Sequence, residues 1–242
     1  HSNINWNFKR TRELFFGIVF ANYLLIKIIA MKNNYYVLLV FLLIFNVVKA
    51  QEKEEETKEK ESKFQIIVSS GIGFAIIESD NEPKYNLNSN SGEILFNFKL
   101  FKDDGIAIGI AHDRLTGNGF NTVGSFYHER SFIRIPLLYT MEYHFTDKIK
   151  YLSNIGVFGQ TIIKDDYQFL NNTQANIYGG WNFGLQATIG FVFKVSKCLN
   201  FGVNLSGQSD FDKFETNPNQ VIIDQQKIKH QYSIGFLVMI DL

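Results

Sequence analysis

The sequence predicts an all-β fold, an eight-stranded antiparallel up-and-down transmembrane β-barrel. Three observations lead to this prediction. From Lys63 onward, apolar and polar residues alternate with a period of two in eight segments, without a convincing helical period. The connections between the segments alternate between short turns and long polar stretches. One face of the segments is large and apolar, and the other is mostly small or polar.

The first four segments alternate clearly. FQIIVSSGIGFAII (64–77) sets phenylalanine, isoleucine and valine against Gln, Ser, Gly and Ala. EILFNFKLF (93–101) and IAIGIAHD (106–113) repeat this pattern, and SFIRIPLLYTMEYHF (131–145) extends it furthest. Pro136 lies inside the fourth segment, and because proline lacks the N–H that a strand ladder needs, we expect a β-bulge there.

The last four segments complete the expected barrel. KYLSNIGVFGQT (150–161) is the least regular of them. WNFGLQATIGFVFKV (181–195), LNFGVNLSGQ (199–208) and HQYSIGFLVMIDL (230–242) again separate a bulky apolar face from a face of Gly, Ser, Asn and Gln. Each pattern is typical of a strand with two different surroundings.

The connections indicate an up-and-down topology. Three are short: DDG (103–105), which carries a strong hairpin signal, TDK (146–148) and SK (196–197). The others are expected to be long polar loops, and they cover residues 79–91, 115–130, 163–177 and 209–227. Short turns at one end and long loops at the other describe an up-and-down barrel.

The composition of the two faces indicates which one points outward. A water-soluble barrel would need charges on its outer surface, but the non-apolar face here is rich in small residues and has few charges. Small side chains suit the narrow interior of an eight-stranded barrel. A bulky uncharged face suits hydrocarbon. We therefore expect the apolar face to point toward lipid.

The N-terminal segments divide into three parts. MKNNYYVLLVFLLIFNVVKAQ (31–51) has the basic start, apolar core and small residues before a cleavage point that define a secretory signal peptide, so we assign residues 31–50 to it. Residues 1–30 then form an untranslated upstream or non-native segment. Residues 51–62 form a charged flexible tail, and residues 63–242 form the barrel.

Charge and cysteine content exclude some functions. The 242-residue chain has a formal net charge of zero. Its first 50 residues hold six basic residues and one acidic residue, so the remainder is acidic, which excludes a natural nucleic-acid binder. The one cysteine, Cys198, excludes an internal disulfide and a cysteine-cluster metal site.

RIPLLYTMEYHF (134–145) and NFGLQATIGFVF (182–193) give the chain a resemblance to the outer-membrane β-barrel domain family of Bacteroidota. This family includes barrels similar to outer membrane protein A and the PorT-like proteins. The resemblance covers about residues 63–242. It implies a monomer in the bacterial outer membrane, with outer-membrane lipid and the barrel assembly machinery as partners. It carries over no catalytic, cofactor-binding or metal-binding residues.

Alternation predicts six charged or titratable side chains inside the barrel: Lys99, Asp113, Arg134, Glu142, His144 and Lys194. We expect Asp113 to pair with Arg134 in one polar layer, and Glu142 to pair with Lys99 or Lys194 in another. A lone charge in a narrow lumen would lose hydration without compensation, so paired charges that fill the lumen are the expected arrangement.

An enzymatic interpretation has weaker support. AHDRL (111–115) contains a His-Asp pair, but alternation sends His112 and Asp113 to opposite faces. The acidic pairs Asp165–Asp166 and Asp210–Asp212 are candidates for a divalent cation. Neither has the spacing of a calcium loop, so solvated loop charge is the preferred interpretation.

Three functions remain open on the sequence. The first is a non-enzymatic outer-membrane barrel whose long extracellular loops serve envelope structure or bind an unknown ligand or partner. The second is a narrow pore or a PorT-like secretion subunit, although an eight-stranded barrel normally has a filled interior. The third is a soluble lipocalin-like carrier with its apolar residues inside.

Overall fold

The computed structural model describes residues 63–121, 124–196, 198–218, 220 and 224–242. The segments assigned above to residues 1–30, the signal peptide and most of the charged tail lie outside these residues. Eight long antiparallel strands form a closed ring, as predicted, in the order β1-β2-β3-β4-β5-β8-β9-β11 with β11 pairing back to β1. They are β1 (Phe64–Ser79), β2 (Tyr85–Lys99), β3 (Asp104–Asn121), β4 (Gly124–Thr146), β5 (Ile149–Gln168), β8 (Trp181–Lys194), β9 (Leu199–Asp210) and β11 (Gln225–Asp241).

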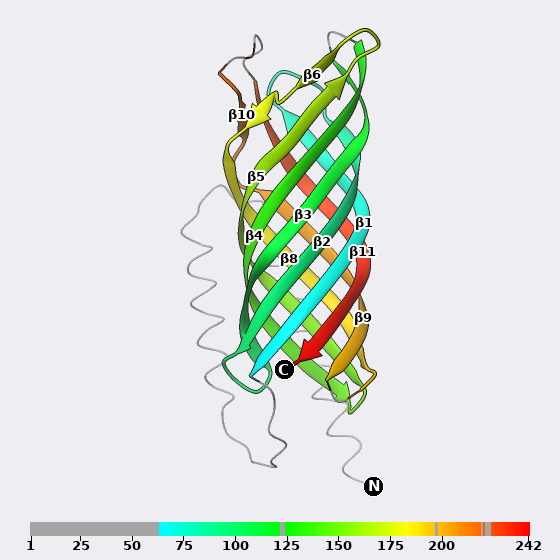
Figure 1. The fold of residues 1–242 in the computed structure, drawn as a ribbon, viewed down its shortest axis with the longest axis vertical. Helices are drawn as coiled ribbons and strands as arrows, with labels where there is room; N and C mark the ends of the chain where they lie inside the picture. Colours follow the sequence, from blue (N-terminus) through cyan, green and yellow to red (C-terminus); the bar gives the residue numbers. More distant parts are fainter. Residues whose placement is uncertain (1–62, 122–123, 197, 219, 221–223) are drawn as a thin grey trace, which may run out of the picture. The chain divides into compact units, whose positions relative to one another are not determined.

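Three very short strands lie outside the ring. β6 (Thr173–Ala175) pairs with β5, and β10 (Phe214–Thr216) pairs with both β11 and β7 (Tyr178–Gly179). All three belong to the end of the barrel with the longer connections, here called the upper end (Figure 1). The end with the short turns is called the lower end. No helix long and apolar enough to cross a membrane occurs among the described residues.

The ring closes where its first and last strands meet. β1 and β11 pair from Gln65 with Asp241 at the lower end to Ser79 with Gln226 at the upper end. Figure 1 shows these two strands, in cyan and red, side by side on one flank of the barrel. One bulge next to Ile76 interrupts their register. The closed ring leaves none of these eight strands as a sheet edge along its main length.

The predicted orientation of the faces is confirmed. Phe96, Ile108, Phe201 and Phe236 come from four strands around the ring, and each is between 45% and 59% exposed. Their neighbours in sequence point inward, as with the fully buried Ala107. The apolar face is therefore the outer surface.

Two of the expected loops are strands instead. Residues 85–91 belong to β2, and residues 115–121 and 124–130 extend β3 and β4 as far as the pair Asn121–Gly124. The cause is a change in the outward residues. Above the apolar belt, β2 points Asn86 and Asn88 outward, so the polarity contrast that reveals a strand disappears. The inward residues keep their alternation.

The expected bulge at Pro136 is also absent. The register between β3 and β4 is the same on both sides of this residue, and Pro136 pairs with Phe158 of β5 without a shift. The ladder between β3 and β4 has a gap here, from Ile108–Leu137 to Ala111–Arg134. Proline thus removes a ladder bond on the β3 side without adding a residue.

Candidate functional site

The interior of the barrel contains two apolar layers. A lower apolar layer contains Ile67, Leu95, Ala107, Leu138, Leu152, Val192, Leu237 and Met239. An upper apolar layer includes Ala75, Ile77, Leu87, Leu115, Phe132, Phe214 and Ile228. On β1, β2, β3, β4 and β11, the inward residues between these two layers are small or polar. A middle polar layer therefore lies between two apolar ones.

Arg134 is the centre of the middle polar layer. Its Nε donates to Asp113 Oδ2 at 3.1 Å, so the structure brings together the two residues that were predicted to pair. Its Nη1 donates to the side-chain oxygen of Gln186, and its Nη2 lies 3.7 Å from Glu93 Oε2. Gln186 in turn donates to Glu93 Oε2 at 2.9 Å. Every member of this network is buried.

Glu93 and Gln186 were not predicted as members of this network. Alternation along the strands places both on the inward face. Glu93 shares the face of Asn97, and Gln186 lies on the face opposite the large apolar residues. Parity was thus a sufficient signal for the face. It gave no signal for depth, which depends on how neighbouring strands are staggered.

Glu142 is the centre of a polar group at the lower end. Lys99 Nζ and Lys150 Nζ each lie 3.4 Å from a Glu142 carboxylate oxygen. The alternative prediction of Lys194 as its partner is wrong, because Lys194 is exposed at the last residue of β8. The second partner of Glu142 is instead Lys150, which lies on the neighbouring strand β5.

His144 is also not in the lumen, contrary to prediction. Its parity is inward, but it lies at the rim beside the turn, where the wall no longer encloses it. The His144 side chain is 37% exposed, and its Nδ1 lies 3.4 Å from Asp103 Oδ1 in the β2–β3 turn.

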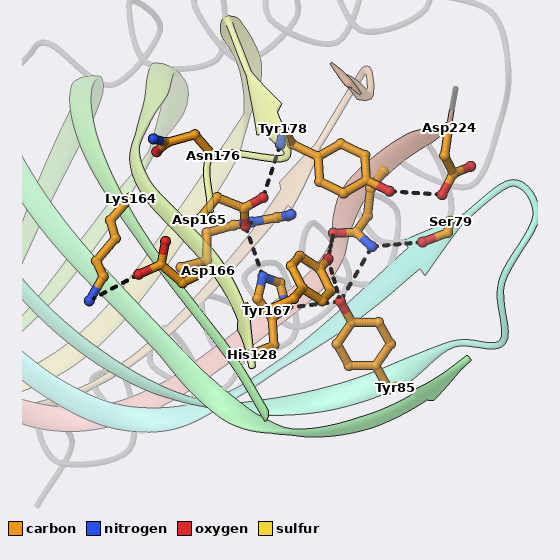
Figure 2. Close-up of polar contacts among 12 residues, drawn as sticks. Ser79, Tyr85, His128, Lys164, Asp165, Asp166, Tyr167, Asn176, Tyr178 and Asp224 are labelled. Atoms are coloured by element: carbon orange, nitrogen blue, oxygen red, sulfur yellow. Dashed lines mark hydrogen bonds and ion pairs between the residues drawn. The ribbon is translucent and has the colours of Figure 1, made fainter. Parts of the chain in front are cut away.

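A third polar group, here called the histidine cluster, fills the lumen near the upper end. It comprises Tyr85, His128, Arg130, Asp165 and Tyr167, which are joined by hydrogen bonds. Figure 2 shows the side chains of Tyr85, His128, Asp165 and Tyr167 lying close together. The outer surface of the same strands carries ion pairs, with Glu129 Oε1 2.9 Å from Arg114 Nη2. The cluster therefore lies above the apolar belt.

Asp165 accepts three hydrogen bonds in this cluster. His128 Nε2 is 2.8 Å and Arg130 Nε is 2.6 Å from its Oδ1, and the backbone N–H of Tyr178 is 3.0 Å from its Oδ2. Asp165 is fully buried, so its expected role as solvated loop charge is wrong. Asp210 is buried as well, and it accepts hydrogen bonds from Gln160 and the Ile228 backbone.

Burial and ion pairing fix the charges of the cluster. Burial alone would raise the pKa of Asp165, but the positive charge of Arg130 and the hydrogen bond from His128 outweigh it and hold the pKa at about 2. Burial, together with the Arg130 charge, lowers the pKa of His128 to about 4. His128 is therefore neutral at pH 7, donating from Nε2 to Asp165 and accepting from Tyr85 Oη at Nδ1, 2.9 Å away.

Aromatic rings lie against the neutral imidazole of His128 and the guanidinium of Arg130. The Tyr167 ring stacks on His128 with a centroid separation of 4.0 Å, and Arg130 lies 5.0 Å from the centroid of the Tyr178 ring. The two Nη atoms of Arg130 have no hydrogen-bond acceptor among the described residues. The ring faces thus supply the stabilisation that these atoms receive.

The cluster has a His-Asp pair but not the access that catalysis requires. The His128 and Asp165 side chains are both 0% exposed. Geometry around a catalytic base must leave room for a reacting group at hydrogen-bond distance. Within the described residues, no three His, Cys, Asp or Glu side chains are placed to share a metal ion. The arrangement holds strands together.

An open groove of about 840 Å³ lies at the upper end. It runs between the upper ends of β3 and β4 and the β5–β6 connection, and its walls include Asn118, Tyr127, Phe169 and Leu170. Leu170 is 96% exposed. The groove is a surface on which a ligand or a partner has room to contact the chain.

The fold and these sites define a class of protein: a closed eight-stranded antiparallel barrel with an apolar outer surface and a lumen filled by charged and apolar layers. No family model matches the chain, and no curated protein matches it.

Several solved structures are similar in fold. Neisserial surface protein A matches with 10% identity and a TM-score of 0.48, over 76% of this chain and 100% of that one. Ail, the attachment invasion locus protein of Yersinia pestis, matches with 8% identity and a TM-score of 0.39, over 74% of this chain and 99% of that one. The N-terminal β-barrel domain of Pseudomonas aeruginosa OprF matches with 10% identity and a TM-score of 0.38, over 75% and 98%. At these identities and TM-scores the likeness carries no inference about function.

Proposed function

We propose that the chain is an integral, non-enzymatic barrel of the bacterial outer membrane whose upper end binds a ligand or partner or serves envelope structure. The observation that carries this proposal is the belt of large apolar side chains on the outer surface of the closed ring. A soluble monomer rarely exposes a contiguous apolar patch larger than a few hundred Å², whereas this belt continues around the barrel. Hydrocarbon is the solvent that such a surface requires.

The interior supports the same proposal against a soluble carrier. A lipocalin-like carrier would keep its apolar residues inside to hold an apolar ligand. Here the middle of the lumen holds the buried carboxylates of Glu93 and Asp113, each of which is paired with the buried Arg134. The polarity of the wall is therefore the reverse of that of a carrier.

The layers also weigh against a narrow pore. Two apolar layers lie across the lumen, one on each side of the middle polar layer. A cavity beside Arg134 has a volume of only about 20 Å³, which is about the space that one water molecule needs. Ions crossing this lumen would have to displace buried side chains, so a filled structural barrel is the better account.

The upper end is the part with room for recognition. Because β2, β3 and β4 continue past the apolar belt, two connections at this end are short and comprise only residues 80–84 and 122–123. The other two connections carry β6, β7 and β10, and the groove lies beside the first of them. Binding by this end, rather than catalysis inside the barrel, fits the sealed His128–Asp165 pair.

A matched pair of substitutions tests the membrane location. Ile189 lies on the outer face near the middle of β8, and Ile189→Arg should destabilise the barrel in vesicles by ~2–4 kcal/mol. Asn88 also points outward, but above the belt on β2, so Asn88→Arg should leave stability nearly unchanged. Urea unfolding in vesicles measures both. A wild-type chain that is monodisperse without detergent, or equal effects of the two variants, would refute the proposal.

A further inference from the structure

Three lysines converge on one carboxylate on the outer surface of the β1–β11 seam. Lys84 Nζ lies 2.5 Å and Lys229 Nζ 3.5 Å from Glu78 Oε1, and Lys227 Nζ lies 4.0 Å from Glu78 Oε2. Their side chains stay between 25% and 51% exposed. The group, here called the lysine cluster, has a net charge of +2 because one carboxylate faces three ammonium groups.

The lysine cluster lies directly above the apolar belt. On the seam, Phe74 pairs with Tyr232, and their rings are in contact with a centroid separation of 5.7 Å. Ile76 and His230 form the next outward pair, and Glu78 with Lys227 the one above it. Glu78 is four positions further along β1 than Phe74, which is about 13 Å along a strand. This height is where lipid headgroups begin if the aromatic pair marks the edge of the hydrocarbon.

The opposite flank of the barrel has a similar set of charges at a similar height, but they cancel. On β3, β4 and β5, Arg114 and Lys164 pair with Glu129 and Asp166 at distances between 2.9 and 3.5 Å. Two cations and two carboxylates give a net charge of zero. Near the lysine cluster, Lys213 and Asp80 form a further pair that is also neutral. Of these three groups on the described surface, the lysine cluster is the one with an excess of positive charge.

We propose that the lysine cluster binds the phosphate group of an anionic lipid in the outer leaflet, an inference that rests on the membrane location proposed above. The ammonium group of lysine is a point charge with three N–H donors on a flexible side chain, and such a group suits a phosphate at the membrane surface. Glu78 keeps the ammonium groups together without neutralising them. The lipid's acyl chains then lie along the Phe74–Tyr232 surface below.

The ion pairing around Glu78 agrees with this arrangement. The hydrogen bond from Lys84 is the main cause that holds the pKa of Glu78 below its ordinary value. Glu78 is therefore ionised at neutral pH and gathers the lysines. A phosphate that approaches from the bilayer meets the two uncompensated positive charges.

The test compares two double variants that each remove two positive charges from the outer surface. The first variant, Lys227→Gln with Lys229→Gln, alters the lysine cluster. The second, Arg114→Gln with Lys164→Gln, alters the neutral group of charges on the opposite flank. Native mass spectrometry of the barrel, released from zwitterionic micelles doped with a bisphosphorylated glycolipid, counts the retained lipid. We expect the first variant to bind this lipid roughly 30-fold more weakly than the wild type, because each lysine near a membrane surface contributes about fivefold. The second should bind within about twofold of the wild type.

Three results would overturn the proposal. These are an equal loss of lipid in both variants, no loss in the first variant, and displacement of the lipid by millimolar inorganic phosphate, which would indicate a site for free phosphate. Insertion into purely zwitterionic vesicles is measured in parallel. If the wild type inserts there but shows no preference for the phosphorylated lipid, only the lipid site fails. If it does not insert at all, the membrane location itself fails.

Discussion

Replacing Asp165 by Asn tests whether the histidine cluster holds the upper barrel together. The change keeps the size of the side chain but removes its charge. Arg130 is fully buried, and its Nε bond of 2.6 Å to Asp165 would then face a neutral oxygen. The amide would also turn an N–H group toward either the Tyr178 backbone N–H or the donors of Arg130 and His128.

The expected loss of stability follows from the charge of Arg130, which would remain buried without a partner. Removing one partner of a buried ion pair costs about 3–5 kcal/mol, since the other charge stays buried without compensation. Asp166 is the matched control, one residue away but on the outer surface, where its oxygen lies 3.5 Å from Lys164 Nζ. Asp166→Asn should cost less than about 1 kcal/mol, as exposed ion pairs do.

Urea unfolding in vesicles, followed by tryptophan fluorescence, measures both variants. Adding Arg130→Met to Asp165→Asn should recover about 2 kcal/mol or more, because it removes the unpaired charge. The reasoning is refuted if Asp165→Asn costs no more than Asp166→Asn. It is also refuted if the second substitution brings no recovery.

Two further predictions concern the other buried charges. A double-mutant cycle of Arg134→Met and Asp113→Asn should give a coupling energy of about 1–3 kcal/mol, and a coupling near zero would show that their 3.1 Å contact does not stabilise the barrel. Stability should fall as the pH drops from 6.5 toward 4, because the pKa of His128 is about 4 when folded and 6.5 when unfolded, so the unfolded chain binds the proton more readily in this window. The full loss is about 3 kcal/mol, and His128→Gln should flatten this part of the pH profile measured by urea unfolding.

The strands within the apolar belt were predictable, since hydrocarbon on one side and a narrow lumen on the other force a strict alternation. That constraint ends where water replaces lipid. Asn86 and Asn88 suit a strand surface that faces water as well as they suit a loop. The upper part of β2 therefore lacks the apolar outward residues that indicate a strand. Its inward residues Tyr85 and Leu87 alone were too few to reveal it.

The candidate sites were predictable by face but not by depth. Parity placed Asp113 and Arg134 inside, and the stagger of adjacent strands then brought them into contact. The same parity placed His144 and Lys194 inside, although both lie at the rim, where the lumen is open. For Asp165 the error was the reverse: it was expected in a solvated loop but is buried in the lumen. The sequence KDDY (164–167) resembles a loop, and only the structure shows that β5 continues past Asp166.

The seam between β1 and β11 has a consequence for the order of events during folding. Gln65 donates to Asp241 Oδ1 at 2.7 Å across a separation of 176 residues, so the contact that closes the ring is among the most distant along the chain. Each of the other seven neighbouring pairs joins strands that follow one another along the ring, so it can form as soon as its second strand is made, whereas this pair joins the first strand to the last. Until then β1 presents an unpaired edge that any other strand can occupy. Such a topology folds slowly, and its success depends on shielding the first strand until the last one arrives.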